Sequence, residues 1–278
     1  MRVTLIIDEL PQDNFRKSSL AILSVIFFSR ASNFFFGIMK YSQIPSQQFD
    51  FYTRTWPAQG TKIATVVFVH GFAEHCDRYD HVFTKVSKAG IEVFSWDQRG
   101  FGQSATNKTA GVNGGWPQQI ADIDHFVSTK RQEGVPQFLW GHSMGGGLTL
   151  KYALDGPHRS QVAGYIASSP LIEIPPAGRP NFLKETLVGD MLDGGKSLLL
   201  HENTSRFTAP LLLAHGDADS VCWHLSSKKF IEAIPSKDKT YKEYPESYHE
   251  IHNDLDRDVV IKDYIQWLVA HTKENAKL

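Results

Sequence analysis

The sequence has few of the features that mark several large classes of protein. Only two of its 278 residues are cysteines, Cys76 and Cys222, which is too few for a disulfide framework and favours a cytoplasmic, reducing environment. The formal net charge is −1, so there is no basic excess to bind a phosphate backbone, and nucleic acid is not an expected partner. With 41% hydrophobic residues, the composition is that of an ordinary globular chain with a substantial core.

The sequence also lacks an uncharged apolar run long enough to cross a bilayer. Leu20–Phe28 is apolar, but Arg30 interrupts the pattern before Phe34–Met39 resumes it. Acidic residues precede the run, which is unlike a secretory signal. We therefore predict an atypical N-terminal apolar segment over residues 1–44. A membrane-contacting amphipathic segment is favoured over a signal anchor or a segment foreign to the domain.

From residue 45 to 278 short β-rich runs alternate with longer amphipathic segments, which predicts one α/β domain. Because parallel strands need crossover connections, the pattern favours a mostly parallel sheet with helices on both faces. The predicted strands are Lys62–His70, Ile91–Trp96, Gln137–Gly141, Val162–Ser168, Pro210–His215 and Tyr241–Tyr244. The predicted helices are Arg78–Lys88, Pro117–Lys130, Met144–Leu154, Leu225–Ile234 and Asp254–Ala270.

One segment, at about residues 171–208, breaks this rhythm. It is rich in proline and glycine at first and then contains a short apolar helix candidate near residues 187–200. Since it lies between two predicted strands, it can cover one end of the sheet. We predict that this insertion is a lid.

The strongest chemical signal is Gly-His-Ser-Met-Gly at residues 141–145, followed by two more glycines. An apolar strand leads into it and a helix leads out, as in the nucleophile elbow, where a sharp turn exposes the serine oxygen. Ser143 is therefore the predicted nucleophile. The alternatives are a glycine-rich helix start without a catalytic serine and, with less support, a phosphate-binding loop, whose lysine is missing.

A serine hydroxyl needs a base that accepts its proton, and in this fold the chain order is serine, acid, histidine. His249 follows the last predicted strand, where a loop can carry its imidazole back over the strand ends, so it is the predicted base. His252 is interpreted as its structural neighbour. The histidines from position 201 onward are His201, His215, His224, His249, His252 and His271.

The acid is expected at the end of an earlier strand, where Pro210–His215 runs into Gly-Asp-Ala-Asp. Asp217 and Asp219 are both candidates, and an acidic strand end is often only a turn. Asp219 is favoured because it lies farther into the loop and can reach a histidine.

An oxyanion hole needs backbone N–H groups directed at the developing charge. Met144 follows the nucleophile at a helix N-terminus, and Phe72 lies in the loop after the first central strand, so their N–H groups are the predicted donors. A zinc site at His70 and His75 is not supported, because no second ligand pair follows at a suitable spacing. We predict neither a metal nor a cofactor.

With these residues in hand, the chain from about Phe51 to His271 resembles the monoacylglycerol lipases of the α/β-hydrolase superfamily, especially the fungal ones. The resemblance rests on the loop at residues 70–75, the segment Trp-Asp-Gln-Arg-Gly-Phe-Gly-Gln-Ser at 96–104, the elbow, and the loops at Asp219 and His249. It implies cofactor-free hydrolysis of monoacylglycerol to glycerol and a fatty acid at or near lipid surfaces. It also implies a triad of Ser143, Asp219 and His249, with oxyanion donors at Phe72 and Met144.

Two features depart from the family pattern. Ala73 stands where family members usually have glycine, and the lid segment is about half the usual length. A short lid would enclose the acyl chain less, and each methylene left in water forfeits about 0.8 kcal/mol. Two alternatives therefore stay open: a broader carboxylesterase or lysophospholipase, and a catalytically impaired lipid-binding relative. The expected partners are a lipid ester substrate and, peripherally, a membrane or lipid droplet.

Overall fold

The computed structural model describes residues 40–43, 49–176 and 189–275. The chain divides into two compact units, residues 1–34 and 35–278, and every described residue belongs to the second. The predicted apolar segment at the N-terminus, up to residue 39, and residues 177–188 of the predicted lid lie outside the described residues.

One eight-stranded sheet organises the described residues, in the order β1-β2-β4-β3-β5-β6-β7-β8. The first two strands are antiparallel to their neighbours, and all later pairs are parallel. The carboxyl ends of β3 to β8 therefore meet at one edge of the sheet. The strands are β1 (Lys40–Gln43), β2 (Asp50–Trp56), β3 (Ala64–Val69), β4 (Ile91–Trp96), β5 (Gln137–His142), β6 (Gly164–Ser168), β7 (Leu211–Gly216) and β8 (Lys239–Tyr244).

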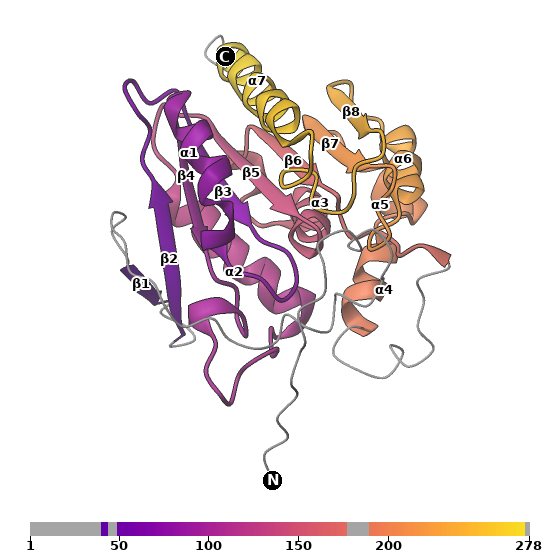
Figure 1. Cartoon of the computed structure of the whole chain (residues 1–278), viewed down its shortest axis with the longest axis horizontal. Helices are drawn as coiled ribbons and strands as arrows, with labels where there is room; N and C mark the ends of the chain where they lie inside the picture. The colour runs from indigo at the N-terminus through magenta and orange to yellow at the C-terminus, as the bar shows by residue number, and fades with distance from the viewer. Residues whose placement is uncertain (1–39, 44–48, 177–188, 276–278) are drawn as a thin grey trace, which may run out of the picture. The chain divides into compact units, whose positions relative to one another are not determined.

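Helices cover both faces of this sheet, and each face has its own hydrophobic cluster (Figure 1). The apolar sides of α1 and α7 pack on one face, and those of α2, α3 and α6 pack on the other. The helices are α1 (Asp80–Lys88), α2 (Gly115–Lys130), α3 (Met144–Asp155), α4 (Gly189–Ser197), α5 (His201–Thr204), α6 (His224–Ala233) and α7 (Arg257–Asn275). Short 3₁₀ turns lie at Cys76–Tyr79, Gly102–Ser104 and Arg159–Gln161.

The predicted strands and helices all occur, with boundaries that differ by a few residues. The continuous apolar runs are the central strands, and all six residues of β3, β5 and β7 are buried. The two antiparallel strands, β1 at the sheet edge and β2 beside it, were not predicted, because β2 mixes buried and partly exposed polar residues. In the predicted lid, α4 coincides with the apolar helix candidate. Within the described ranges, none of the helices is long and apolar enough to cross a membrane.

Candidate active site

Ser143 occupies a strained turn between β5 and α3. Its backbone lies at φ 56° and ψ −118°, a conformation that non-glycine residues rarely adopt. The flanking glycines allow this turn, because a Cβ at Gly141 would lie 2.0 Å from the Gly145 carbonyl oxygen, and one at Gly145 would lie 2.1 Å from the Val69 carbonyl oxygen. The turn thus places the Ser143 hydroxyl at the carboxyl edge of the sheet.

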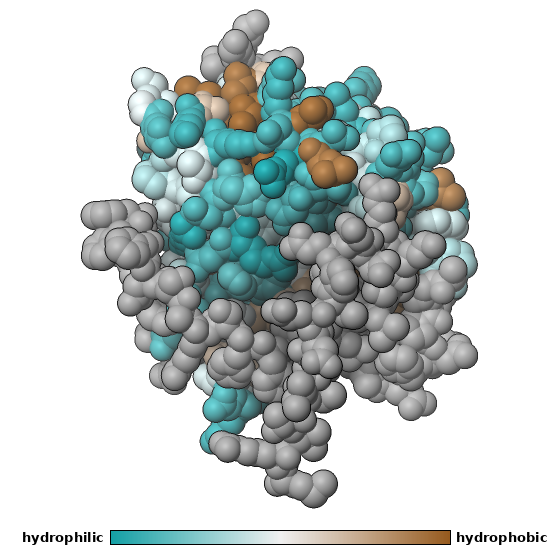
Figure 2. Space-filling view, in the orientation of Figure 1, coloured by the Kyte–Doolittle hydropathy of each residue, from teal (hydrophilic) through white to brown (hydrophobic). Residues whose placement is uncertain are grey.

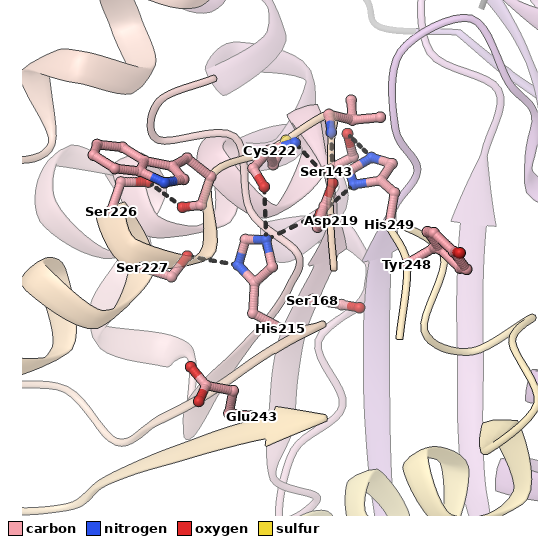
Figure 3. Close-up of polar contacts among 12 residues, drawn as sticks. Ser143, Ser168, His215, Asp219, Cys222, Ser226, Ser227, Glu243, Tyr248 and His249 are labelled. Carbon is pink, nitrogen blue, oxygen red and sulfur yellow. Dashed lines mark hydrogen bonds and ion pairs between the residues drawn. The ribbon is translucent and has the colours of Figure 1, made fainter. Parts of the chain in front are cut away.

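Three side chains that are far apart in the sequence meet at this edge (Figure 3). His249, in the loop after β8, has its Nε2 atom 2.9 Å from Ser143 Oγ. Its Nδ1 atom lies 2.7 Å from Asp219 Oδ2, in the loop after β7. Because a carboxylate can only accept, the proton of the neutral imidazole is on Nδ1, and Nε2 is free to accept the Ser143 proton.

The Asp219 carboxylate is fully buried and receives hydrogen bonds on both oxygens. Oδ1 accepts the backbone N–H groups of Val221 and Cys222 at 2.7 and 2.9 Å. Oδ2 accepts a hydrogen bond from Nδ1 of His249 and another, at 3.0 Å, from Nε2 of a second imidazole, His215. Asp217, the other acidic candidate, instead accepts the backbone N–H of Glu246 at 2.6 Å.

These contacts shift the pKa values in the directions that acid–base chemistry needs. Burial alone would raise the pKa of Asp219, but the charge of His249 and the hydrogen bonds from both imidazoles outweigh burial and lower it. Burial alone would lower the pKa of His249, yet the Asp219 carboxylate raises it above its ordinary value. Asp219 is therefore ionised and His249 is more basic than a free imidazole.

The loop after β3 lies directly beside the nucleophile. A Cβ at Gly71 would come 3.1 Å from Ser143 Cβ, so the chain at this point can approach only as glycine. Ala73, the departure from the family pattern, has φ 57°, a left-handed conformation that costs a residue with a Cβ about 1–2 kcal/mol. Met144 begins α3, where the first N–H groups have no acceptor within the helix.

Buried polar groups outside the predicted set hold this loop in place. The Nδ1 atom of the His70 imidazole lies 2.7 Å from the Gly71 carbonyl oxygen. Its Nε2 atom accepts the Gln98 backbone N–H at 2.8 Å. Burial lowers the pKa of His70 to about 3, so the ring is neutral. Gln98 belongs to the 96–104 motif, whose role sequence reasoning had not assigned.

A second support joins this loop to the loop that carries the base. The Glu74 carboxylate accepts the Gly71 backbone N–H and, at 2.7 Å, the Tyr79 hydroxyl, and burial raises its pKa to about 7. Arg78 lies 3.7 Å from Glu74 and donates to both oxygens of Glu250 at 2.8 Å. Because Glu250 follows His249, this chain of contacts fixes the base relative to the loop after β3.

The two cysteines are free and buried. Cys222 lies in the loop after β7 and donates its backbone N–H to Asp219 Oδ1, and burial with the nearby Asp219 charge raises the pKa of its thiol well above the ordinary value. It is therefore a neutral thiol. Among the residues that the structure describes, no three His, Cys, Asp or Glu side chains are grouped so that they could hold a metal ion.

Comparison with known proteins assigns the chain to a family. The sequence pattern of the serine aminopeptidase S33 family matches residues 60–192 and 185–256. The chain belongs to this family. It is a serine hydrolase with the α/β-hydrolase fold, as the sequence predicted.

Named relatives of this S33 chain are monoglyceride lipases. A monoglyceride lipase of Saccharomyces cerevisiae is 30% identical over 80% of this chain and 90% of its own length. The solved structure of a soluble variant of the Saccharomyces cerevisiae enzyme with a substrate analog matches with a TM-score of 0.75 and 27% identity, covering 86% of this chain and 97% of that one. The resemblance to monoacylglycerol lipases is thereby confirmed.

A more distant solved structure agrees with these relatives. The monoacylglycerol lipase of Paleococcus ferrophilus matches with a TM-score of 0.68 and 25% identity, over 80% of this S33 chain and 99% of its own. The fold is thus shared with both of these solved lipases.

Proposed function

We propose that this protein hydrolyses monoacylglycerols to glycerol and a fatty acid through an acyl-enzyme on Ser143. The observation that carries the proposal is the continuous chain of contacts from Asp219 to His249 at 2.7 Å and from His249 to Ser143 at 2.9 Å. The names of the relatives supply the substrate class.

In the first half-reaction His249 Nε2 takes the proton of the Ser143 hydroxyl as Oγ bonds to the ester carbonyl carbon. The carbonyl oxygen becomes an oxyanion, which the N–H groups of Phe72 and Met144 stabilise. As the intermediate collapses, the bond to the glycerol oxygen breaks, and this oxygen takes the proton from His249.

Water reverses the sequence in the second half-reaction. It attacks the acyl-enzyme carbonyl while giving a proton to His249, and the fatty acid leaves as that proton returns to Ser143 Oγ. Throughout, Asp219 stays ionised, keeps the imidazole in the tautomer that accepts at Nε2, and stabilises the imidazolium that forms in each step.

The first test is covalent labelling. A fluorophosphonate probe should label the wild-type protein and leave Ser143→Ala unlabelled, since the variant lacks the attacking oxygen. Ser168→Ala is the matched control: its hydroxyl is buried near the site but accepts a hydrogen bond from Tyr264 instead. Labelling that persists in Ser143→Ala would contradict the proposal.

The substrate class is tested by a series of esters. Turnover should be higher with long-chain monoacylglycerol than with short p-nitrophenyl esters or lysophospholipid. A preference for short esters would favour the broader carboxylesterase, and equal turnover of lysophospholipid would favour the lysophospholipase. No turnover of any ester by folded, probe-reactive protein would contradict ester hydrolysis altogether.

We further propose that the protein acts in the cytoplasm, in peripheral contact with a membrane or lipid droplet, because long-chain monoacylglycerols partition into lipid. On the face shown in Figure 2 the described residues are mostly hydrophilic, with separate hydrophobic groups toward the top. The exposed large hydrophobic residues are Phe72, Val112, Leu200, Leu225, Tyr248, Leu255 and Val259. Ser143→Ala should co-sediment with phosphatidylcholine vesicles containing monoacylglycerol; if it stays in the supernatant, the contact is absent.

A further inference from the structure

A second imidazole contacts the acid of the triad from the side opposite His249 (Figure 3). His215 lies near the end of β7 with its side chain 0% exposed. Its Nε2 atom is 3.0 Å from Asp219 Oδ2 and 3.2 Å from the Cys222 carbonyl oxygen, and its Nδ1 atom is 2.8 Å from Ser227 Oγ. The reaction described above makes no use of this residue.

The surroundings of His215 determine which ring nitrogen carries the proton. Nε2 faces only acceptors, the Asp219 carboxylate and the Cys222 carbonyl, so it must be the donor. Nδ1 then accepts the Ser227 hydroxyl proton. Burial lowers the pKa of His215 despite the nearby Asp219 carboxylate, so the ring is a neutral donor.

We propose that His215 is a positioning residue that fixes the Asp219 carboxylate for His249. This inference rests on the proposed function, because it assigns His215 a part in the reaction of Ser143. Two backbone N–H groups already hold Oδ1 of Asp219, and His215 holds Oδ2, so the carboxylate cannot rotate away from His249. Sharing Oδ2 between two imidazoles also limits how strongly Asp219 raises the basicity of His249.

Other titratable groups face the same pair from neighbouring elements. The His142 ring, on β5, lies 4.9 Å from the His249 ring, and the His224 ring, on α6, lies 6.4 Å from that of His215. The charges of Glu250 and Glu74 raise the pKa of His249. A substitution of His215 leaves these groups in place, so a change in the pH profile reports the loss of its hydrogen bond to Asp219.

Two amide substitutions test separately the hydrogen bonds that the two ring nitrogens of His215 make. The side-chain amide of His215→Gln can reach the position of Nε2 and donate to Asp219. The shorter amide of His215→Asn reaches only the position of Nδ1, so it can pair with Ser227 but not with Asp219. Both side chains are neutral and polar, so the comparison isolates the bond to Asp219.

We expect kcat to fall in His215→Asn and to be largely retained in His215→Gln. kcat of His215→Asn should fall about 10- to 150-fold, the factor that corresponds to the 1.5–3 kcal/mol of a hydrogen bond to a charged group, with little change in KM. The acidic limb of its kcat/KM profile should move to higher pH. Oδ2 of Asp219 then accepts a hydrogen bond from His249 alone, so the carboxylate raises the basicity of His249 further. An unchanged kcat and an unchanged limb in the folded Asn variant would overturn the proposal.

The matched control is His271→Asn on α7, which removes another histidine–aspartate contact, 3.0 Å from His271 Nε2 to Asp238 Oδ2. It should alter thermal stability without moving the pH profile. If His271→Asn shifts the limb as much as His215→Asn does, the effect is not specific to His215, and the proposal fails.

A measurement on the wild-type protein stands even if His215→Asn does not fold. Nitrogen-15 NMR of the histidine side chains should show His215 as a neutral ring with its proton on Nε2 from pH 7 to 9. A proton on Nδ1, or an imidazolium in this range, would overturn the proposal. Fluorophosphonate labelling of the wild type tells the two proposals apart: without labelling the proposed function fails, and with labelling but no His215 effect only this inference fails.

Discussion

At the scale of single residues, the reactivity of this site depends on what surrounds each ionisable group. His249 is 18% exposed at its side chain and faces an ionised carboxylate, so its pKa is raised. His142 and His252 lie within a few ångströms of it or of each other, yet neither ring contacts a carboxylate of the described residues, and burial lowers their pKa values. Identical side chains thus have opposite protonation behaviour within one site.

The pH dependence of catalysis follows from this difference. The base must be neutral to accept the Ser143 proton, so kcat/KM should fall as pH drops through the raised pKa of His249, that is, above the ordinary histidine value. Asp219→Asn should lower kcat about 10⁴-fold and move the acidic limb down, because it removes the charge that raises this pKa. Both are measured by pH–rate profiles.

Asp217→Asn is the control for this prediction. Asp217 ends the same strand but only accepts the Glu246 backbone N–H, a bond that an amide oxygen can also accept. Its profile should match the wild type. Equal losses in both variants would mean that the loop, rather than the Asp219 charge, determines activity.

At the scale of elements, the carboxyl edge of the parallel sheet brings the site together. β5 leads into Ser143, the proposed nucleophile, β7 into the loop of Asp219, and β8 into the loop of His249, while β3 ends in the loop beside Ser143. The elbow packs tightly against the end of β3, where a Cβ at Gly145 would lie 2.1 Å from the Val69 carbonyl oxygen and 2.5 Å from that of His70.

Gly145→Ala should therefore disrupt the elbow. The new Cβ would lie 2.1 Å from the Val69 carbonyl oxygen, so backbone must move, which we expect to cost about 3 kcal/mol or more and to abolish fluorophosphonate labelling. Denaturant unfolding and labelling measure the two effects.

Gly134→Ala serves as the comparison, because it lies before β5, at the opposite end of this strand, and its Cβ meets nothing within 4 Å. It has φ 73° and should lose about 1–2 kcal/mol of stability while keeping full labelling. If Gly145→Ala loses no more stability than Gly134→Ala and still labels, the tight contact does not constrain the elbow.

At the scale of the whole domain, several buried histidines couple stability to pH. His70 and His252 have their pKa values lowered by burial to about 3, whereas an unfolded chain binds a proton at each near 6.5. Between these values the unfolded state holds more protons, so stability falls as pH falls below 6.5. Glu74, whose pKa burial raises to about 7, acts in the opposite direction.

A single substitution measures the contribution of one buried histidine to the pH dependence of stability. Between pH 7 and pH 5 each such histidine should contribute a loss of about 2 kcal/mol, from 1.5 pKa units at 1.36 kcal/mol each. His252→Gln cannot take up a proton, so its unfolding free energy should fall by about 2 kcal/mol less than that of the wild type over this range. Parallel curves for the two proteins in denaturant titrations would show that His252 is not buried as a neutral ring.

What the sequence determined is local: the elbow, the strand–helix alternation and the order of serine, acid and histidine. These follow from neighbours in the chain, because glycines flanking a serine between a strand and a helix encode a sharp turn wherever it lies. The sequence favoured Asp219 but kept Asp217 as an alternative, since both end the same strand. Only the tertiary structure directs Asp219 toward His249, places His215 behind it, and connects Gln98 to His70 and Glu250 to Arg78. The contacts of Asp219 with His249, Gln98 with His70 and Glu250 with Arg78 join residues 28 to 172 positions apart, and no local pattern specifies which buried polar groups will satisfy one another.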